Sequence, residues 1–201
     1  MSTFQTYATL GFRHIADLGA LDHILFLVAL AAIYRLRDWR DALWVVTAFT
    51  VGHSVTLALA VTRVLELPTT LIEFLIPITI VVTGIENMIV RDRRRAPWRG
   101  RYRPVFAGAF GLVHGAGFAN YLRSMFVDQI ALPLLGFNVG IELGQIAVLT
   151  VVSITLVGLD RAIERVGRTG LVWSPHRLRV VAVSSLVTVV AFGWAIERKP
   201  W

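Results

Sequence analysis

The chain has 201 residues, of which 56% are hydrophobic and only 16% are charged. This charged share lies well below the roughly 25% of a typical soluble domain, and the mean hydropathy of +0.66 argues against an ordinary soluble protein. The composition therefore favours an integral membrane protein. Since each span needs roughly 20 apolar residues, we expect about five to seven spans in a single transmembrane domain over residues 1–201.

The absence of cysteine excludes disulfides and thiolate ligands, so a metal site must use histidine, carboxylate, amide or backbone oxygen. The net charge of +7 comes from short basic clusters between apolar segments, and this pattern argues against a nucleic-acid partner. Residues 1–10 are polar and contain no Lys or Arg, so we expect no cleavable signal peptide.

Apolar runs predict an all-α, polytopic membrane protein that forms a bundle of about six transmembrane helices. In chain order the helices are expected at about 18–34, 42–60, 71–90, 105–122, 133–157 and 180–195. Lys and Arg gather in the stretches 35–40, 91–103 and 161–179, which follow the first, third and fifth helices. Because basic residues accumulate in cytoplasmic loops, we expect a multi-pass protein of the cell inner membrane with both termini outside.

Ionisable residues lie inside these runs, where each costs roughly 2.5–3.5 kcal/mol on insertion scales and usually marks a functional path. They are Asp22, His23, His53, Glu73, Glu86, His114 and Glu142. With a helical rise of about 1.5 Å per residue, four of them fall roughly 8–14 Å below the outer surface: His23, His53, His114 and Glu142. Glu73 is expected at the outer mouth and Glu86 nearer the cytoplasm.

A set of three histidines with Asp22 and Glu142 suits a borderline divalent metal ion such as Ni, Zn, Co or Fe(II). A single membrane histidine is more often a hydrogen-bonded packing residue, but three at similar depth beside two carboxylates favour a metal site. Asp22 either binds the ion or fixes an imidazole tautomer by accepting a ring N–H. His14 joins the site if the chain folds back before the first helix, whereas His176, in an Arg-rich stretch, is expected at the surface.

The predicted helix 133–157 has two opposite faces. Its polar stripe, spaced i, i+4 and i+7, consists of Asn138, Glu142 and Gln145. Its other face repeats a glycine every fourth residue, the spacing of close helix packing in membranes: Gly136, Gly140 and Gly144. We therefore expect this helix to pack tightly on one side and to line a polar cavity with the other.

Several stretches together resemble the HupE/UreJ family of bacterial membrane proteins over roughly residues 11–155. They are 11–30 (GFRHIADLGALDHILFLVAL), 48–59 (AFTVGHSVTLAL), 73–87, 111–118 (GLVHGAGF) and 137–145 (FNVGIELGQ). The resemblance implies a nickel, or nickel and cobalt, permease associated with hydrogenase or urease systems. It also implies that the metal-binding motif residues are His14, Asp22, His23, His53, His114 and Glu142.

The leading prediction is a divalent transition-metal permease of the nickel type. The ion would pass Glu73 and His14, bind at the histidines and carboxylates, and leave toward the cytoplasm. The predicted pathway residues are Glu73, Glu86, Asn87, Asn138 and Gln145. Polar side chains along the third helix slightly favour transport over a metal-dependent intramembrane hydrolase, which would use the same site with an open coordination position.

A metal-dependent accessory subunit with neither activity is a third alternative. The expected partners are the lipid bilayer and the metal ion, with no nucleic acid. The sequence leaves open which metal is bound, in which direction it moves and whether the chain forms a homo-oligomer.

Overall fold

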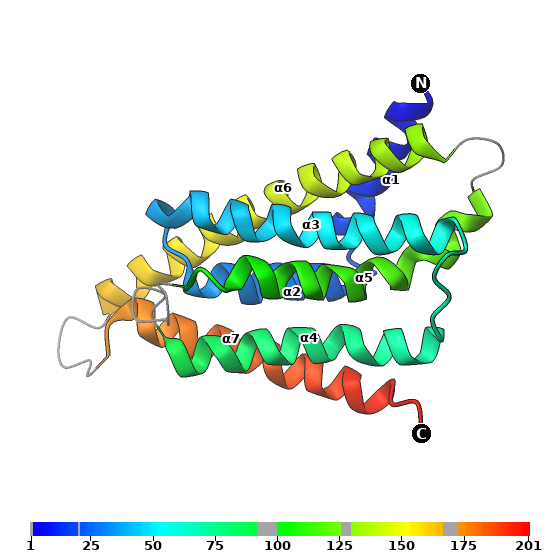
Figure 1. Cartoon of the computed structure of the whole chain (residues 1–201). Coiled ribbons are helices and arrows are strands. Elements are labelled where there is room, and N and C mark those ends of the chain that lie inside the picture. The colour runs from blue at the N-terminus through cyan, green and yellow to red at the C-terminus, as the bar shows by residue number, and fades with distance from the viewer. Residues whose placement is uncertain (1, 20, 92–99, 126–129, 167–172) are drawn as a thin grey trace.

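The computed structural model describes residues 2–19, 21–91, 100–125, 130–166 and 173–201, and the regular elements of these ranges are all helical (Figure 1). In chain order they are α1 (Thr3–Ala16), α2 (Leu21–Ile33), the short 3-10 helix η1 (Leu36–Asp38), α3 (Trp39–Val61), α4 (Thr69–Val90), α5 (Arg103–Met125), α6 (Ala131–Val166) and α7 (Pro175–Glu197). The expected all-α fold is confirmed for this part of the chain. Each predicted apolar run falls on one of the helices α2 to α7.

Helix α1 was not predicted from hydropathy, because its sequence TFQTYATLGFRHIA is too polar for a span. A local signal for it exists. The Ser2 hydroxyl accepts the backbone N–H of Gln5, and the Gln5 side chain accepts the N–H of Ser2. This reciprocal capping box satisfies two amide groups at the start of the helix.

Four helical segments of the described chain are long and apolar enough to cross a membrane: Leu36–Val61, Thr69–Val90, Ala131–Arg165 and Pro175–Glu197. The bent pair α1 and α2 makes a fifth if it counts as one broken span. Helix α5 is not among the candidates found in the described residues. Six crossings and the direction of the termini therefore stay predictions.

Glycines bring two helix pairs into backbone contact, α1 with α6 and α3 with α5. A Cβ on Gly140 of α6 would overlap the carbonyl oxygen of Ala8 in α1, and a Cβ on Gly11 would overlap that of Phe137 in α6. Gly111 of α5 approaches the α3 backbone equally closely. The predicted glycine face of α6 is thus a packing seam, and its partner is α1.

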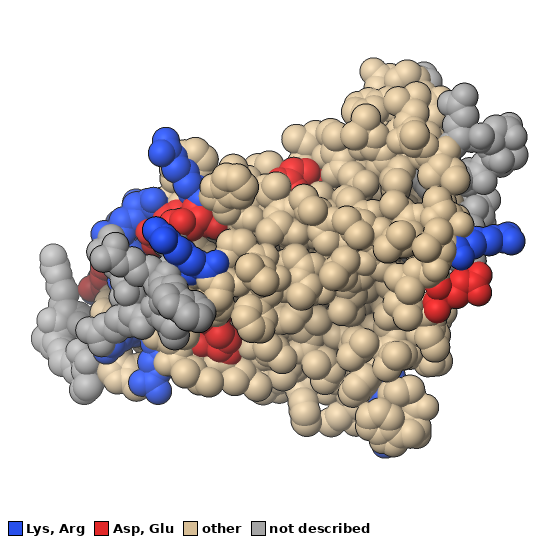
Figure 2. Space-filling model, in the orientation of Figure 1, with Lys and Arg blue, Asp and Glu red and all other residues tan. Residues whose placement is uncertain are grey.

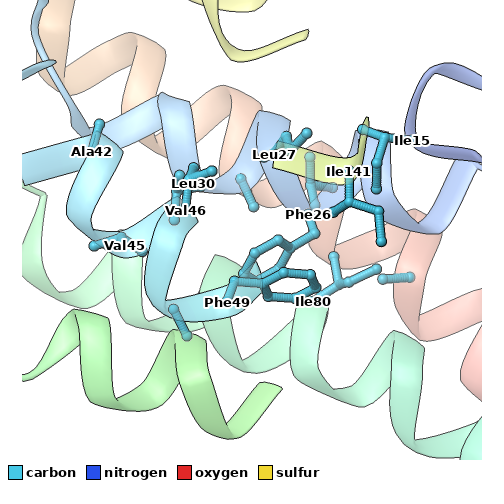
Figure 3. Packing of buried hydrophobic residues seen from close by; sticks show 14 of the residues in the cluster. Ile15, Phe26, Leu27, Leu30, Ala42, Val45, Val46, Phe49, Ile80 and Ile141 are labelled. Carbon is cyan, nitrogen blue, oxygen red and sulfur yellow. The ribbon is translucent and has the colours of Figure 1, made fainter. Parts of the chain in front are cut away.

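The core of the bundle is formed by apolar side chains from the inward faces of the helices (Figure 3). Phe26 of α2 and Phe49 of α3 lie at its centre, with ring centroids 4.8 Å apart. Ile80 of α4 and Ile141 of α6 are completely buried in the same cluster. These contacts hold α2 between its neighbours and fix where its histidine lies.

The outer surface is apolar where a bilayer would cover it. Ile89, Leu186 and Val189 are 74%, 67% and 70% exposed, which suits side chains that contact lipid. Figure 2 shows a broad, mostly uncharged belt, with Lys and Arg gathered mainly at the end of the molecule where α3 begins and α4 ends. This distribution agrees with the basic clusters noted in the sequence.

Candidate metal centre

Three histidines from three different helices meet inside the bundle. One ring nitrogen each from His14 (α1), His23 (α2) and His53 (α3) lies within 4.8 Å of the others. The ring centroids of His14 and His23 are 4.7 Å apart, and that of His53 lies 6.3 Å and 6.1 Å from them. Among the described residues this is the group that could hold a metal ion.

The break between α1 and α2 explains why His14 reaches the group. Helix α1 ends at Ala16, and Asp17 then accepts the backbone N–H of Gly19 at 2.8 Å, which closes a tight turn. His14 lies in the last turn of α1, and His23 lies in the first turn of α2. The two helices are bent by 67° relative to each other at this break, and two histidines nine positions apart come close together.

His114 of α5 lies beside this group. Its ring centroid is 5.2 Å from that of His23, and the residue is 1% exposed. The Thr79 hydroxyl donates to the Ile76 carbonyl at 2.7 Å, so its single proton is already used. His114 Nε2, 3.0 Å from the Thr79 oxygen, must therefore donate its N–H, which leaves the lone pair on Nδ1.

Five buried ring nitrogens of these histidines lack hydrogen-bond partners in the described part of the chain. The unpartnered atoms are His14 Nε2, His23 Nε2, both ring nitrogens of His53, and His114 Nδ1. Leaving a buried polar atom without a partner costs about 1–3 kcal/mol. If these histidines only filled space in the core, several such costs would add up. A bound cation would give the same nitrogen lone pairs a partner. For His114, a side-chain hydroxyl on one nitrogen and a free lone pair on the other is the usual arrangement of a ligating imidazole.

The two predicted carboxylate ligands have other partners. Asp22 is bound by Arg198, whose Nη1 lies 3.2 Å from both carboxylate oxygens. Glu142 accepts hydrogen bonds from the hydroxyls of Thr47, at 2.6 Å, and Thr50. Glu142 therefore lies in a hydroxyl network between α6 and α3, one turn from His53, and not within the three-histidine group.

The polar stripe on α6 has two further residues, Gln145 and Asn138. Gln145 is buried, and its side-chain oxygen lies 2.8 Å from the Thr50 hydroxyl. The Asn138 side-chain oxygen is buried and has no hydrogen-bond partner among the described residues.

A cavity of about 350 Å³ opens beside the histidines. Its lining includes His14, His23, Glu73, Asp22 and Arg198, so the predicted outer-mouth residue Glu73 shares one space with the candidate ligands. Glu73 itself is exposed.

The predicted cytoplasmic pathway residues form a closed polar network. Glu86 pairs with Arg103 and accepts a hydrogen bond from Tyr102. Asn87 is completely buried, donates to the Ala29 carbonyl at 2.6 Å and accepts from Arg103 at 2.8 Å. Burial of its ring and the hydrogen bond to Glu86 raise the pKa of Tyr102, so that hydroxyl keeps its proton. Through these contacts Asn87 joins α4 to α2, and Arg103 joins α4 to α5.

A second, smaller cavity of about 80 Å³ adjoins this network and is lined by Glu86, Tyr102, Phe26 and Phe110 among others. The Phe26 ring centroid is also 5.7 Å from that of His114. Phe26, stacked on Phe49, thus lies between the histidines and the smaller cavity.

The surface position expected for His176 is wrong. The residue is only 8% exposed, and its Nδ1 lies 2.8 Å from the Arg179 guanidinium. The reason is that α7 begins at Pro175, behind a Ser174 cap, and not near 180. His176 is therefore a helix residue. The Ser174–Pro175 pair, a cap followed by proline, was the sequence signal for this helix start.

The chain matches the family described as HupE / UreJ protein over residues 1–198, nearly its whole length, and it therefore belongs to this family. A search of curated proteins and a search of solved structures gave no match. The chain is a helical membrane protein of a family linked to metal transport, and it contains a histidine group that could bind a metal ion.

Proposed function

We propose that this member of the HupE/UreJ family is a multi-pass inner-membrane permease for a divalent transition-metal ion of the nickel type. The observation that carries the proposal is the meeting of half-buried His14 with buried histidines from other helices, with buried ring nitrogens that lack hydrogen-bond partners among the described residues. The proposed ligands are His14, His23, His53 and His114.

The chemistry of the ligand set suits this class of ion. Neutral imidazole binds Ni, Zn, Co and Fe(II) well, whereas Mg and Ca prefer oxygen ligands. Metal–nitrogen bonds of about 2.0–2.1 Å bring ligand atoms to roughly 3–3.5 Å of one another. Because the three nitrogens of the group already lie within 4.8 Å, small side-chain rotations are enough to close the site.

The carboxylates would act around this centre. Glu142, held by two threonine hydroxyls next to His53, would supply negative charge without direct ligation. Asp22 adjoins His23 in the chain and lines the same cavity. Asp22→Asn should therefore weaken binding about 10- to 100-fold, the typical effect of losing an outer partner of a ligand.

Two cavities with Phe26 between them favour transport over hydrolysis. The larger cavity adjoins the histidines, and the smaller one ends at the Glu86–Arg103 pair. A permease needs its ion site to be open to one side of the membrane and then to the other. The Phe26–Phe49 stack and the Glu86–Arg103 pair would form the barrier on the second side. The hydrolase alternative would use the same histidines but needs no second cavity.

The test is elemental analysis of purified protein together with Ni²⁺ uptake into proteoliposomes. His53→Ala and His114→Ala should each lose stoichiometric metal and uptake, because the remaining ligands leave an incomplete coordination shell. His176→Gln, a histidine substitution outside the group, should keep both, and gel filtration checks the fold of each variant. Metal retained by both alanine variants would refute the shared site, and tight binding without uptake would favour the hydrolase.

A further inference from the structure

Arg198 reaches into the cavity that adjoins the histidines. It follows α7 directly, yet its Nη1 lies 3.2 Å from both carboxylate oxygens of Asp22 at the start of α2, 176 residues away in the chain. The side chains are 32% and 19% exposed, so the pair is partly shielded from solvent. The guanidinium lines the same space as His14, His23 and Glu73.

Contacts on either side hold Arg198 in this place. Its backbone N–H donates to the Trp194 carbonyl at 2.9 Å, and its guanidinium carbon lies 5.4 Å from the centre of the Trp194 ring. Trp201 at the end of the chain packs against Phe74 of α4, with centroids 5.4 Å apart. The C-terminal residues are therefore fastened to α4 next to Glu73, with Arg198 beside the cavity.

A guanidinium in this position opposes a cationic substrate in two ways. It occupies the carboxylate that lies next to His23, and its own charge repels a divalent cation within the cavity. We propose that Arg198 is an internal counter-ion that competes with the substrate cation for Asp22, so that the Asp22–Arg198 pair must open before the ion binds. This inference rests on the proposed function, and it assigns to Arg198 control of the affinity for the ion.

Lys199 offers a matched control. It carries the same charge, is the next residue in the chain and is exposed. Arg198→Gln and Lys199→Gln therefore change the net charge equally, but only the first removes a cation from the cavity.

The experiment is a Ni²⁺ titration of purified parent and variants, combined with thermal unfolding without metal. Arg198→Gln should bind Ni²⁺ about fivefold more tightly, the effect of a partly exposed ion pair, although the metal-free protein unfolds at the same or a lower temperature. Lys199→Gln should match the parent. In the Asp22→Asn background the gain from Arg198→Gln should largely disappear.

A second variant keeps the test valid if Arg198→Gln folds poorly. Trp201→Ala leaves all charges in place but removes the contact with Phe74, so it should also tighten Ni²⁺ binding, by a smaller factor. A purely structural role of Arg198 predicts that affinity and stability fall together, and this result would overturn the inference. Unchanged affinity in Arg198→Gln would overturn it while leaving the permease proposal intact, whereas no Ni²⁺ binding by parent or variants would overturn both.

Discussion

Replacing Gly140 by alanine tests whether the α1–α6 seam positions the metal centre. A Cβ at this position would lie 2.8 Å from the Ala8 carbonyl carbon and 2.9 Å from the Phe12 nitrogen, whereas ordinary contacts are 3.4–4 Å. Both neighbours are backbone atoms of α1, which cannot rotate aside. The difference between 3.4 and 2.8 Å means that α1 must retreat by at least 0.6 Å.

That displacement adds to the movement that the ring nitrogens, now within 4.8 Å of one another, need in order to bind one ion, and metal–ligand distances hold to about ±0.2 Å. Helix α1 carries His14, so its retreat withdraws one ligand from His23 and His53. We expect Gly140→Ala to lower the free energy of unfolding by about 1–3 kcal/mol, the usual effect of overpacking. Ni²⁺ affinity should fall as well, and the larger side chain of Gly140→Leu should prevent normal assembly.

Thermal unfolding in detergent and Ni²⁺ titration measure the two effects. Gly158→Ala is the matched control, because it lies on the same helix and a Cβ there meets nothing within 4 Å. Alanine is favoured over glycine in a helix by roughly 0.5–1 kcal/mol, so this variant should be as stable as the parent or more so. A Gly140→Ala protein with the parent's unfolding temperature and Ni²⁺ affinity would refute the reasoning.

Two further predictions concern the site and the topology. Ni²⁺ binding should be lost reversibly on acidification, because imidazolium cannot ligate; binding that does not change in acid while the protein stays folded would contradict ligation by histidine. Reporters fused after Arg95 and Arg168, positions outside the described residues, should be cytoplasmic and one at the C-terminus external, and a cytoplasmic C-terminus would contradict six crossings.

The helices α2 to α7 could be predicted because apolar runs and helical periodicity are local properties of the sequence. The same holds for the glycine face of α6, whose four-residue repeat defines a seam before its partner is known. The depth estimate also needs only the helical rise, and it placed His23, His53 and His114 at similar heights. The structure brings the rings of His23 and His114 within 5.2 Å of each other.

The rest depended on contacts that no local pattern contains. Whether His14 joins the group depends on the bend between α1 and α2 and on the packing of α1 against α6. The sequence could not show the partners of Asp22 and Glu142, since an arginine 176 positions away binds one and threonine hydroxyls of α3 bind the other. Such pairings are decided only when helices distant in sequence pack together.

The partners of the carboxylates bear on how a charged ion could cross this bundle. Neutral imidazoles bind a divalent cation without cancelling its charge, and in a medium of low dielectric an uncompensated charge is strongly unfavourable. Asp22 at one end and Glu86 at the other are each paired with an arginine. Glu142 can compensate part of the charge at the histidines, and Asp22 and Glu86 can compensate more of it if each carboxylate releases its arginine as the ion approaches. Transport would then proceed by exchange of ion-pair partners, first at Asp22 and later at Glu86, and the Phe26–Phe49 stack would separate the two exchanges.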